Sequence, residues 1–248
     1  MSNQYDADIV GQYDRSFSMI PLRQYVELPS VYQILGDVTG LAVLDLACGT
    51  GYYTRELRRR GAIRVVGVDL SEEMIRATRS REEKEPLGVE YMLGDAGALD
   101  HLGDFDIVTG VHLLHYANSF EHLKGMCESI SRNLNSGGRF IGYQLNYDVS
   151  REPHYYDKYC FNVRISENTV DGHPFTFSVK LGDYTSPDIT AYYWSKESLE
   201  SALRKAELKE IRWVVPTSSP EGIEKLGTDF WADVMRRPFE LIVTCRKT

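Results

Sequence analysis

The sequence lacks several features that would assign it to whole classes of protein. Its four cysteines (Cys48, Cys127, Cys160 and Cys245) are scattered over 248 residues, with no Cys-x-x-Cys pair and no cysteine–histidine cluster. We therefore expect reduced thiols and no structural zinc. No apolar run is long enough to cross a bilayer, and the polar, acidic N-terminal segment does not resemble a secretory signal. These absences predict a cytoplasmic protein with no membrane partner.

Positive charge is also scarce. The chain has 28 lysines and arginines against 36 acidic residues, which gives a net charge of -8 and a pI near 5.3. Such a protein is repelled by phosphate backbones, so we expect no nucleic-acid partner. At 42% hydrophobic residues the chain can bury one full core. We predict a single domain over residues 1–248, as a monomer or homodimer.

Strand-like and helix-like segments alternate along most of the chain. Ser71 and Ser195 each stand before a helical pattern with acidic residues in its first turn, as N-cap residues do. Alternation of this kind predicts a Rossmann-like α/β fold, with a mostly parallel sheet covered by helices on both faces. The expected strands are 41–47, 64–70, 89–95, 105–114, 137–145, 210–216 and 239–245, and the expected helices are 52–61, 72–80, 119–134 and 195–208.

Two segments interrupt this alternation. Residues 1–35 precede the first strand and contain several tyrosines, and residues 146–194 are rich in aromatic and polar residues. The second segment is too long for a bare loop, and its stretches 175–181 and 189–194 resemble short antiparallel strands. We predict an N-terminal helical lid (1–35), a core (36–145), a substrate cap (146–194) and a C-terminal part of the core (195–248).

The stretch "VLDLACGTGYYTREL" (43–57) joins a buried strand to a helix through two glycines. The N-terminus of a helix offers unpaired amide groups, and glycine lets a ligand approach the backbone closely. Ligands of open α/β sheets bind at this edge. Asp45, Gly49 and Gly51 therefore predict a ligand site.

Two further acidic residues follow the next strands. Asp69 ends the second strand, at the distance where an acid reaches the hydroxyls of a ribose, and Asp95 ends the third within "GDA". An acid after each of the first three strands favours a nucleoside ligand over three unrelated helix caps.

These motifs, together with "VVGVDLSEEMI" and "FDIVTGVHLLHY", resemble the class I S-adenosylmethionine (SAM)-dependent methyltransferases over residues 38–145. The resemblance implies a sheet of about seven strands whose last strand is antiparallel, and SAM as cofactor. It implies that Asp69 binds the ribose and Asp95 the adenine amine. The residues that it places around the cofactor are Tyr13, Arg23, Asp45, Ala47, Gly49, Gly51, Asp69, Leu70, Met74, Asp95, Ala96 and Val111.

Two other functions remain open at this point. A dinucleotide-dependent oxidoreductase would use the same first strand, although its Gly-x-Gly-x-x-Gly pattern lacks the third glycine in "GTGYYT". A subunit of the same fold that binds the cofactor without methylating, as a regulatory protein, is the second alternative.

The sequence after the fourth strand narrows the expected acceptor. It reads "VHLLHY" rather than the "[DNS]PP[YF]" of methyltransferases that act on nucleic-acid bases, and it lacks the acids of the metal-dependent enzymes. We therefore expect no metal and a small, aromatic or heterocyclic acceptor methylated on nitrogen or oxygen. The N-terminal segment and the region 192–208 also resemble bacterial methyltransferases of specialised metabolism, of the toxoflavin type, which implies antibiotic or toxin biosynthesis.

Histidines near the expected methyl position are the candidates for a general base, because the pKa of histidine lies near 6.5. His112 and His115 are the expected catalytic residues. The residues expected to bind the acceptor are Phe17, Tyr25, His115, Tyr143 and Trp194.

Overall fold

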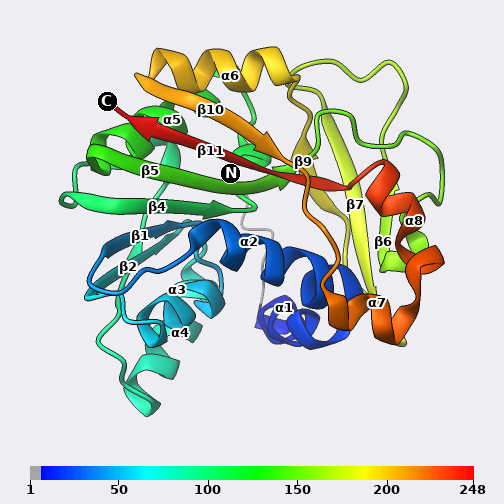
Figure 1. Cartoon of the computed structure of the whole chain (residues 1–248), viewed down its shortest axis with the longest axis horizontal. Helices are drawn as coiled ribbons and strands as arrows, with labels where there is room; N and C mark the ends of the chain where they lie inside the picture. The colour runs from blue at the N-terminus through cyan, green and yellow to red at the C-terminus, as the bar shows by residue number, and fades with distance from the viewer. Residues whose placement is uncertain (1–6) are drawn as a thin grey trace.

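The computed structural model describes residues 7–248 and confirms the predicted fold. A seven-stranded sheet has the order β10-β11-β5-β4-β1-β2-β3 (Figure 1). The five strands from β5 to β3 are parallel, and β11 is antiparallel to both of its neighbours. The strands are β1 (Ala42–Leu46), β2 (Arg64–Asp69), β3 (Glu90–Leu93), β4 (Phe105–Val111), β5 (Leu134–Leu145), β10 (Leu208–Val214) and β11 (Glu240–Lys247).

Alternate side chains of the central strands face two helical layers. On β1, Leu44 and Leu46 pack into the cluster that contains side chains of helices α5 and α6, and Val43 packs with side chains of α2 and α3. This alternation follows from the period of two in a strand. The helices are α1 (Ala7–Met19), α2 (Leu28–Leu35), α3 (Tyr52–Arg59), α4 (Glu72–Lys84), α5 (Phe120–Asn133) and α6 (Lys196–Lys205), with a π-helical turn η1 (Arg23–Glu27) between α1 and α2.

The predicted N-caps of two helices are confirmed. The hydroxyl of Ser71 accepts a hydrogen bond from the amide of Met74, and that of Ser195 accepts one from the amide of Ser198. Each cap satisfies an amide that has no partner inside its helix. Since Ser71 lies two residues after Asp69, the last residue of β2, the first of these caps starts α4 at the ligand edge.

A second, antiparallel sheet lies beyond the carboxyl ends of β4 and β5 (Figure 1). Its strands β7 and β9 confirm the two strands expected within 146–194. Two short helices that the pattern did not predict complete this part, and the second of them, α8, shares a buried aromatic cluster with the sheet. The elements are β6 (Phe161–Arg164), β7 (Pro174–Leu181), β8 (Tyr184–Thr185), β9 (Ile189–Tyr192), α7 (Pro220–Leu226) and α8 (Thr228–Arg236). From here on we call β6 to β9, α7 and α8 together the cap, which adds two helices to the cap predicted over 146–194. Its role stays a prediction.

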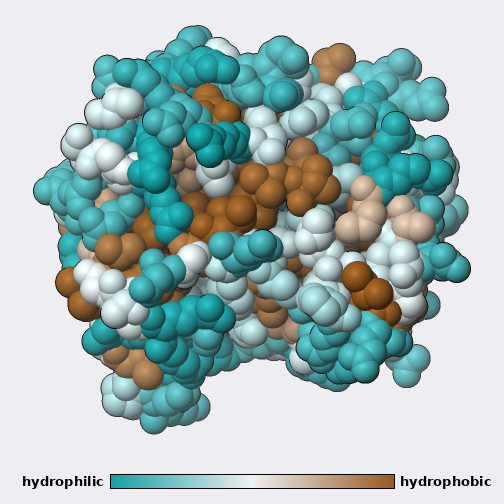
Figure 2. Space-filling model, viewed as in Figure 1, coloured by the Kyte–Doolittle hydropathy of each residue, from teal (hydrophilic) through white to brown (hydrophobic). Residues whose placement is uncertain are grey.

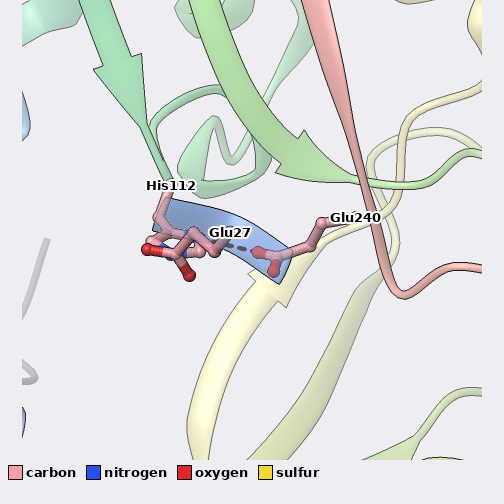
Figure 3. Close-up of side chains that lie close together, drawn as sticks. All are labelled: Glu27, His112 and Glu240. Carbon is pink, nitrogen blue, oxygen red and sulfur yellow. Dashed lines mark hydrogen bonds and ion pairs between the residues drawn. The ribbon is translucent and has the colours of Figure 1, made fainter. Parts of the chain in front are cut away.

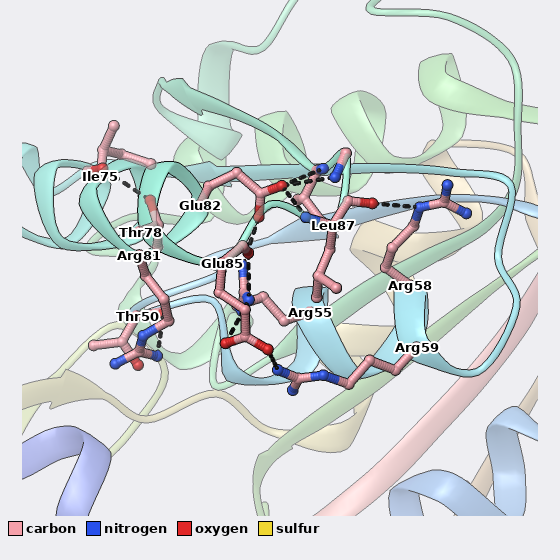
Figure 4. A network of polar contacts seen from close by, with 12 residues as sticks. Thr50, Arg55, Arg58, Arg59, Ile75, Thr78, Arg81, Glu82, Glu85 and Leu87 are labelled. Atoms are coloured by element: carbon pink, nitrogen blue, oxygen red, sulfur yellow. Dashed lines mark hydrogen bonds and ion pairs between the residues drawn. The ribbon is translucent and has the colours of Figure 1, made fainter.

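A polar network joins α3 to α4 and to the start of β3 (Figure 4). The buried guanidinium of Arg55 contacts the carboxylate of Glu82 at 2.5 Å and donates to the carbonyl of Glu85 at 2.8 Å. The other oxygen of Glu82 accepts from three successive amides, those of residues 87–89. This network fixes the link that leads into β3, and hence the position of Asp95 after it.

The surface is mostly polar, with hydrophobic residues gathered in a band across the middle of one face, where β5 and β11 lie in Figure 1 (Figure 2). Among the described residues, none of the helices combines the length and apolar character needed to cross a membrane.

Candidate functional site

A cavity of about 280 Å³ lies at the carboxyl edge of the large sheet, between the sheet, α1 and the cap. Its volume is near the lower end of the range for small-molecule sites. One half is lined mainly by residues from the ends of β1 to β4, and the other by residues of the cap together with Ile20, Tyr116, Phe239 and Glu240. Of the predicted site residues, the cavity is lined by Tyr13, Arg23, Ala47, Gly49, Asp69, Leu70, Met74, Asp95, Ala96, Val111, His112 and His115.

The glycine loop is held by Asp69. The amide of Gly49 donates to one carboxylate oxygen at 2.8 Å, and the amide of Ser71 donates to the other at 2.9 Å. Burial raises the pKa of Asp69 above its ordinary value. Gly49 has a positive φ of 54°, and a Cβ there would lie 3.3 Å from the ring of Tyr13. The loop thus leaves a narrow space between its backbone and helix α1.

Asp45 and Gly51 do not line the cavity. The Asp45 carboxylate accepts from the hydroxyls of Thr54 and Thr109, each at 2.7 Å, and burial raises its pKa to about 6. A Cβ on Gly51 would lie 2.6 Å from the hydroxyl of Tyr91. Asp45 and Gly51 therefore support the glycine loop without facing the cavity.

Asp95 and its neighbours form the outer end of the cavity. One carboxylate oxygen of Asp95 accepts from the amide of Gly97 at 2.7 Å and lies 3.2 Å from Nε2 of His122. Ala96 and Met74 are buried, and Leu70 is 49% exposed. The three apolar side chains and the carboxylate suit a flat ring that carries a polar group at its edge.

Arg23 enters the cavity from η1. Its guanidinium donates to the hydroxyl of Ser16 at 2.6 Å, lies over the rings of Tyr13 and Phe17, and approaches Glu27 to 3.7 Å. The side chain is buried, and Nε has no hydrogen-bond partner among the described residues.

Glu27, His112 and Glu240 form a charged cluster (Figure 3), and two of its members, His112 and Glu240, line the cavity. Nδ1 of His112 lies 2.6 Å from Glu240, and Nε2 lies 3.3 Å from Glu27. Burial lowers the pKa of His112, but the two carboxylates outweigh burial and raise it to about 9. The imidazole is therefore protonated at neutral pH. It has no free lone pair for a general base.

These three residues offer ligand atoms that lie within 4.8 Å of one another, a spacing that could also suit a metal ion. Both ring nitrogens of His112, however, face carboxylates, and Arg23 lies beside Glu27. This arrangement matches an imidazolium between two carboxylates. The absence of a metal stays a prediction.

His115 has the opposite electrostatic environment. Its Nδ1 accepts a hydrogen bond from the amide of Leu145 at 3.3 Å. Burial, with the nearby charge of His112, lowers its pKa to about 3. The ring is therefore neutral, and because Nδ1 is the acceptor, the proton lies on Nε2. His115 offers the cavity a hydrogen-bond donor rather than a base.

The inner half of the cavity is apolar. Phe177, Val179 and Leu181 alternate along one face of β7 and line it together with further cap residues. The alternation places every second side chain of β7 on the cavity. The other residues of this half are Ile20, Tyr116, Phe161, Tyr184, Ser186, Ile189, Phe239 and Glu240.

Four residues expected to bind the acceptor lie outside the cavity lining. Phe17 stacks on Tyr52 with ring centroids 3.9 Å apart, and Tyr25 packs edge-on against Trp231. Tyr143 packs against His112 from behind.

Trp194, the fourth, is buried and donates its indole N–H to the carbonyl of Ala117 at 3.0 Å. All four are core residues in this structure, so we do not assign them to acceptor binding.

Glu27 and Glu240 are site residues that the sequence pattern did not indicate. Glu240 is the second residue of the apolar stretch "FELIVTC" (239–245), and Glu27 lies in the segment expected to be a lid. A signal for Glu240 was available. The last strand is antiparallel, so its first residue must lie at the edge where the parallel strands end.

Comparison with known proteins finds similar sequences and similar folds. Residues 43–138 match the family described as a methyltransferase domain. The demethylmenaquinone methyltransferase of Lactococcus lactis is 29% identical over 208 residues, which cover 82% of this chain and 76% of that protein. A ubiquinone biosynthesis O-methyltransferase of a Bradyrhizobium species is 30% identical over 112 residues, and this chain spans only 43% of its length. Among solved structures, a SAM-dependent methyltransferase from Mesorhizobium loti has a TM-score of 0.63 at 22% identity, covering 89% of this chain and 97% of that one.

Proposed function

The chain is a SAM-dependent methyltransferase with the class I fold, and on that basis we propose that it methylates a nitrogen or oxygen of a small, mostly apolar acceptor. The observation that carries this proposal is the continuity of the cavity. One space runs from the glycine loop and Asp69 to the apolar face of β7.

The loop half fits the cofactor. Gly49 leaves backbone space that a side chain would fill, and the Asp69 carboxylate faces the cavity at the end of β2. We propose that Asp69 accepts from the ribose hydroxyls and Asp95 from the adenine amine. Ala47 and Val111 would contact the methionine part through their backbone, with Tyr13 and Arg23 covering it from α1 and η1.

SAM supplies a methyl group made electrophilic by its sulfonium. The chain's own residues have three tasks around it. The glycine loop and Asp69 hold the cofactor, the cap excludes water, and the walls fix the acceptor's orientation. Holding two reactants in the correct orientation lowers the activation free energy by up to about 7–11 kcal/mol in favourable cases. Positioning is therefore the main contribution to catalysis here.

The inner half supports a small acceptor because the cap encloses it. Its walls are Phe161, Phe177 and Leu181, with few polar atoms. Relatives named for menaquinone and ubiquinone biosynthesis act on small molecules by their names, which agrees with this reading. A place in antibiotic or toxin biosynthesis stays a prediction from the sequence.

Calorimetry with the intact protein tests the proposed class. S-adenosylhomocysteine (SAH) should bind and NAD should not, because Asp69, Asp95 and the glycine loop are arranged for one nucleoside. Tight binding of NAD with no response to SAH would instead favour the oxidoreductase. SAH binding without methyl transfer to any small acceptor would favour a regulatory subunit.

A further inference from the structure

We propose that Glu240 and His115 recognise the acceptor as a pair, so that the acceptor carries an N–H or O–H group next to a hydrogen-bond-accepting atom, as a lactam or a hydroxy-carbonyl compound does. This inference rests on the proposed function and names the class of acceptor that the inner half of the cavity would take.

Glu240 is the accepting member of the pair. It is the first residue of β11, it lines the cavity, and its side chain is only 7% exposed. One carboxylate oxygen contacts Nδ1 of His112 at 2.6 Å. The other oxygen accepts no hydrogen bond from residues 7–248. Because Glu240 lines the cavity, this oxygen is open to a ligand, and an N–H or O–H donor there would form a charge-assisted hydrogen bond with it.

His112 and Glu27 position this carboxylate. The protonated ring lies between the two carboxylates, and Glu27 is itself held by the hydroxyl of Tyr53 at 2.8 Å and by Arg23. The amide of His112 also donates to the carbonyl of Tyr143 at 2.7 Å, which fixes the ring at the end of β4. These contacts hold one oxygen of Glu240 and leave the other toward the cavity.

His115 is the donating member. Its Nδ1 is occupied by the amide of Leu145, so its Nε2–H is the group available to a ligand. Leu145 also lies opposite Glu240 in the pairing of β5 with β11. The shared neighbour places the donor and the acceptor at one point of the sheet edge. The rings of His115 and His112 are 5.9 Å apart between centroids.

The apolar walls complete the expected acceptor. Phe177, Phe239 and Ile189 line the same half of the cavity and suit a flat, apolar body. Such a ring would present one polar edge, with its donor to Glu240 and its acceptor atom to His115.

Two probes separate these contacts. 2-Quinolone has adjacent N–H and C=O groups on an apolar ring, and N-methyl-2-quinolone keeps the C=O and loses the N–H. SAH-loaded wild-type protein should bind 2-quinolone at least about tenfold more tightly, since a hydrogen bond to a charged group has an effect of that size. Glu240→Gln should remove most of this preference. His115→Phe should weaken both probes by a similar factor.

Glu221→Gln, a change of an exposed carboxylate on α7, serves as the matched control and should alter neither probe. SAH affinity, measured first on each variant, shows that the cofactor half is intact. If SAH does not bind, the proposed function fails. If SAH binds but wild type does not prefer 2-quinolone, binds neither probe, or keeps its preference in Glu240→Gln, the recognition pair is refuted.

Discussion

Gly49 donates its amide hydrogen to the carboxylate of Asp69 over 2.8 Å, which joins the glycine loop to the end of the neighbouring strand. We expect Asp69→Ala to weaken SAH binding by roughly 10- to 150-fold, because it removes an acceptor for the ribose and releases the loop. Calorimetry measures the change. Asp37→Ala is the matched control, since the Asp37 carboxylate also accepts from a backbone amide, that of Thr39, but at an exposed site. An unchanged SAH affinity in folded Asp69→Ala would remove this residue from the cofactor site.

A substitution at Gly49 tests whether the cofactor occupies the space beside the backbone of the glycine loop. We expect Gly49→Ala to reduce SAH affinity, because the new Cβ lies 3.3 Å from the Tyr13 ring. Gly40→Ala provides the comparison. Gly40 also has a positive φ, of 77°, but nothing lies within 4 Å of its Cβ position. Both changes should cost about 1–2 kcal/mol of unfolding free energy from backbone strain, and only the first should affect SAH. Equal SAH affinities in the two variants would contradict the assignment.

The cluster around His112 predicts a loss of stability at alkaline pH. Its pKa is about 9 in the folded protein, against about 6.5 in an unfolded chain. The folded state therefore binds the extra proton between these values. The stabilisation is complete below about pH 6.5 and is lost as the pH rises through about 9, at up to about 1.4 kcal/mol per pH unit.

Urea unfolding between pH 6 and 9.5 measures this slope. The titratable groups that face His112 are Glu27, Glu240, His115 and Tyr143, and the first two supply the charge that holds its proton. His112→Gln should flatten the slope, whereas His173→Gln, at an exposed position, should leave it as in wild type. A wild-type slope in His112→Gln would assign the proton to another group.

Substitutions of two aromatic residues test which side chains line the cavity and which belong to the core. Phe177 lines the cavity, so Phe177→Ala should weaken binding of 2-quinolone with little change for SAH. Trp194 is buried away from it and bonded to Ala117, so Trp194→Ala should lower the unfolding free energy by about 3–5 kcal/mol. If Trp194→Ala were stable and selectively impaired in 2-quinolone binding, the sequence-based assignment of Trp194 to the acceptor would hold instead.

The sequence indicated the sheet and the cofactor edge because local patterns determine both. Asp69 is the last residue of the buried strand β2 and Asp95 follows β3 by two residues, and strand ends can be located from apolar periodicity. Gly49 lies in a turn whose geometry favours glycine. These features depend on residues close together in the chain.

The acceptor half depends on contacts between distant segments, and the sequence indicated it poorly. Glu27 and Glu240 meet at His112 only after η1 and β11 reach the same sheet edge. Aromatic residues were abundant, but composition alone could not show that Phe177 faces the cavity and Trp194 the core. Because side chains alternate between the two faces of a strand, the residues of β7 that line the cavity can be identified once the strand's partner is known.

The most direct test of the account is transfer of a labelled methyl group. The protein is incubated with SAM that carries a trideuteriomethyl group and with a metabolite extract, and small molecules are analysed by mass spectrometry. The account predicts a labelled compound with a nitrogen- or oxygen-bound methyl group, formed together with SAH and absent with Gly49→Ala at cofactor concentrations that saturate only wild type. Firm binding of SAH, with the label found in no small molecule from any extract, would contradict it.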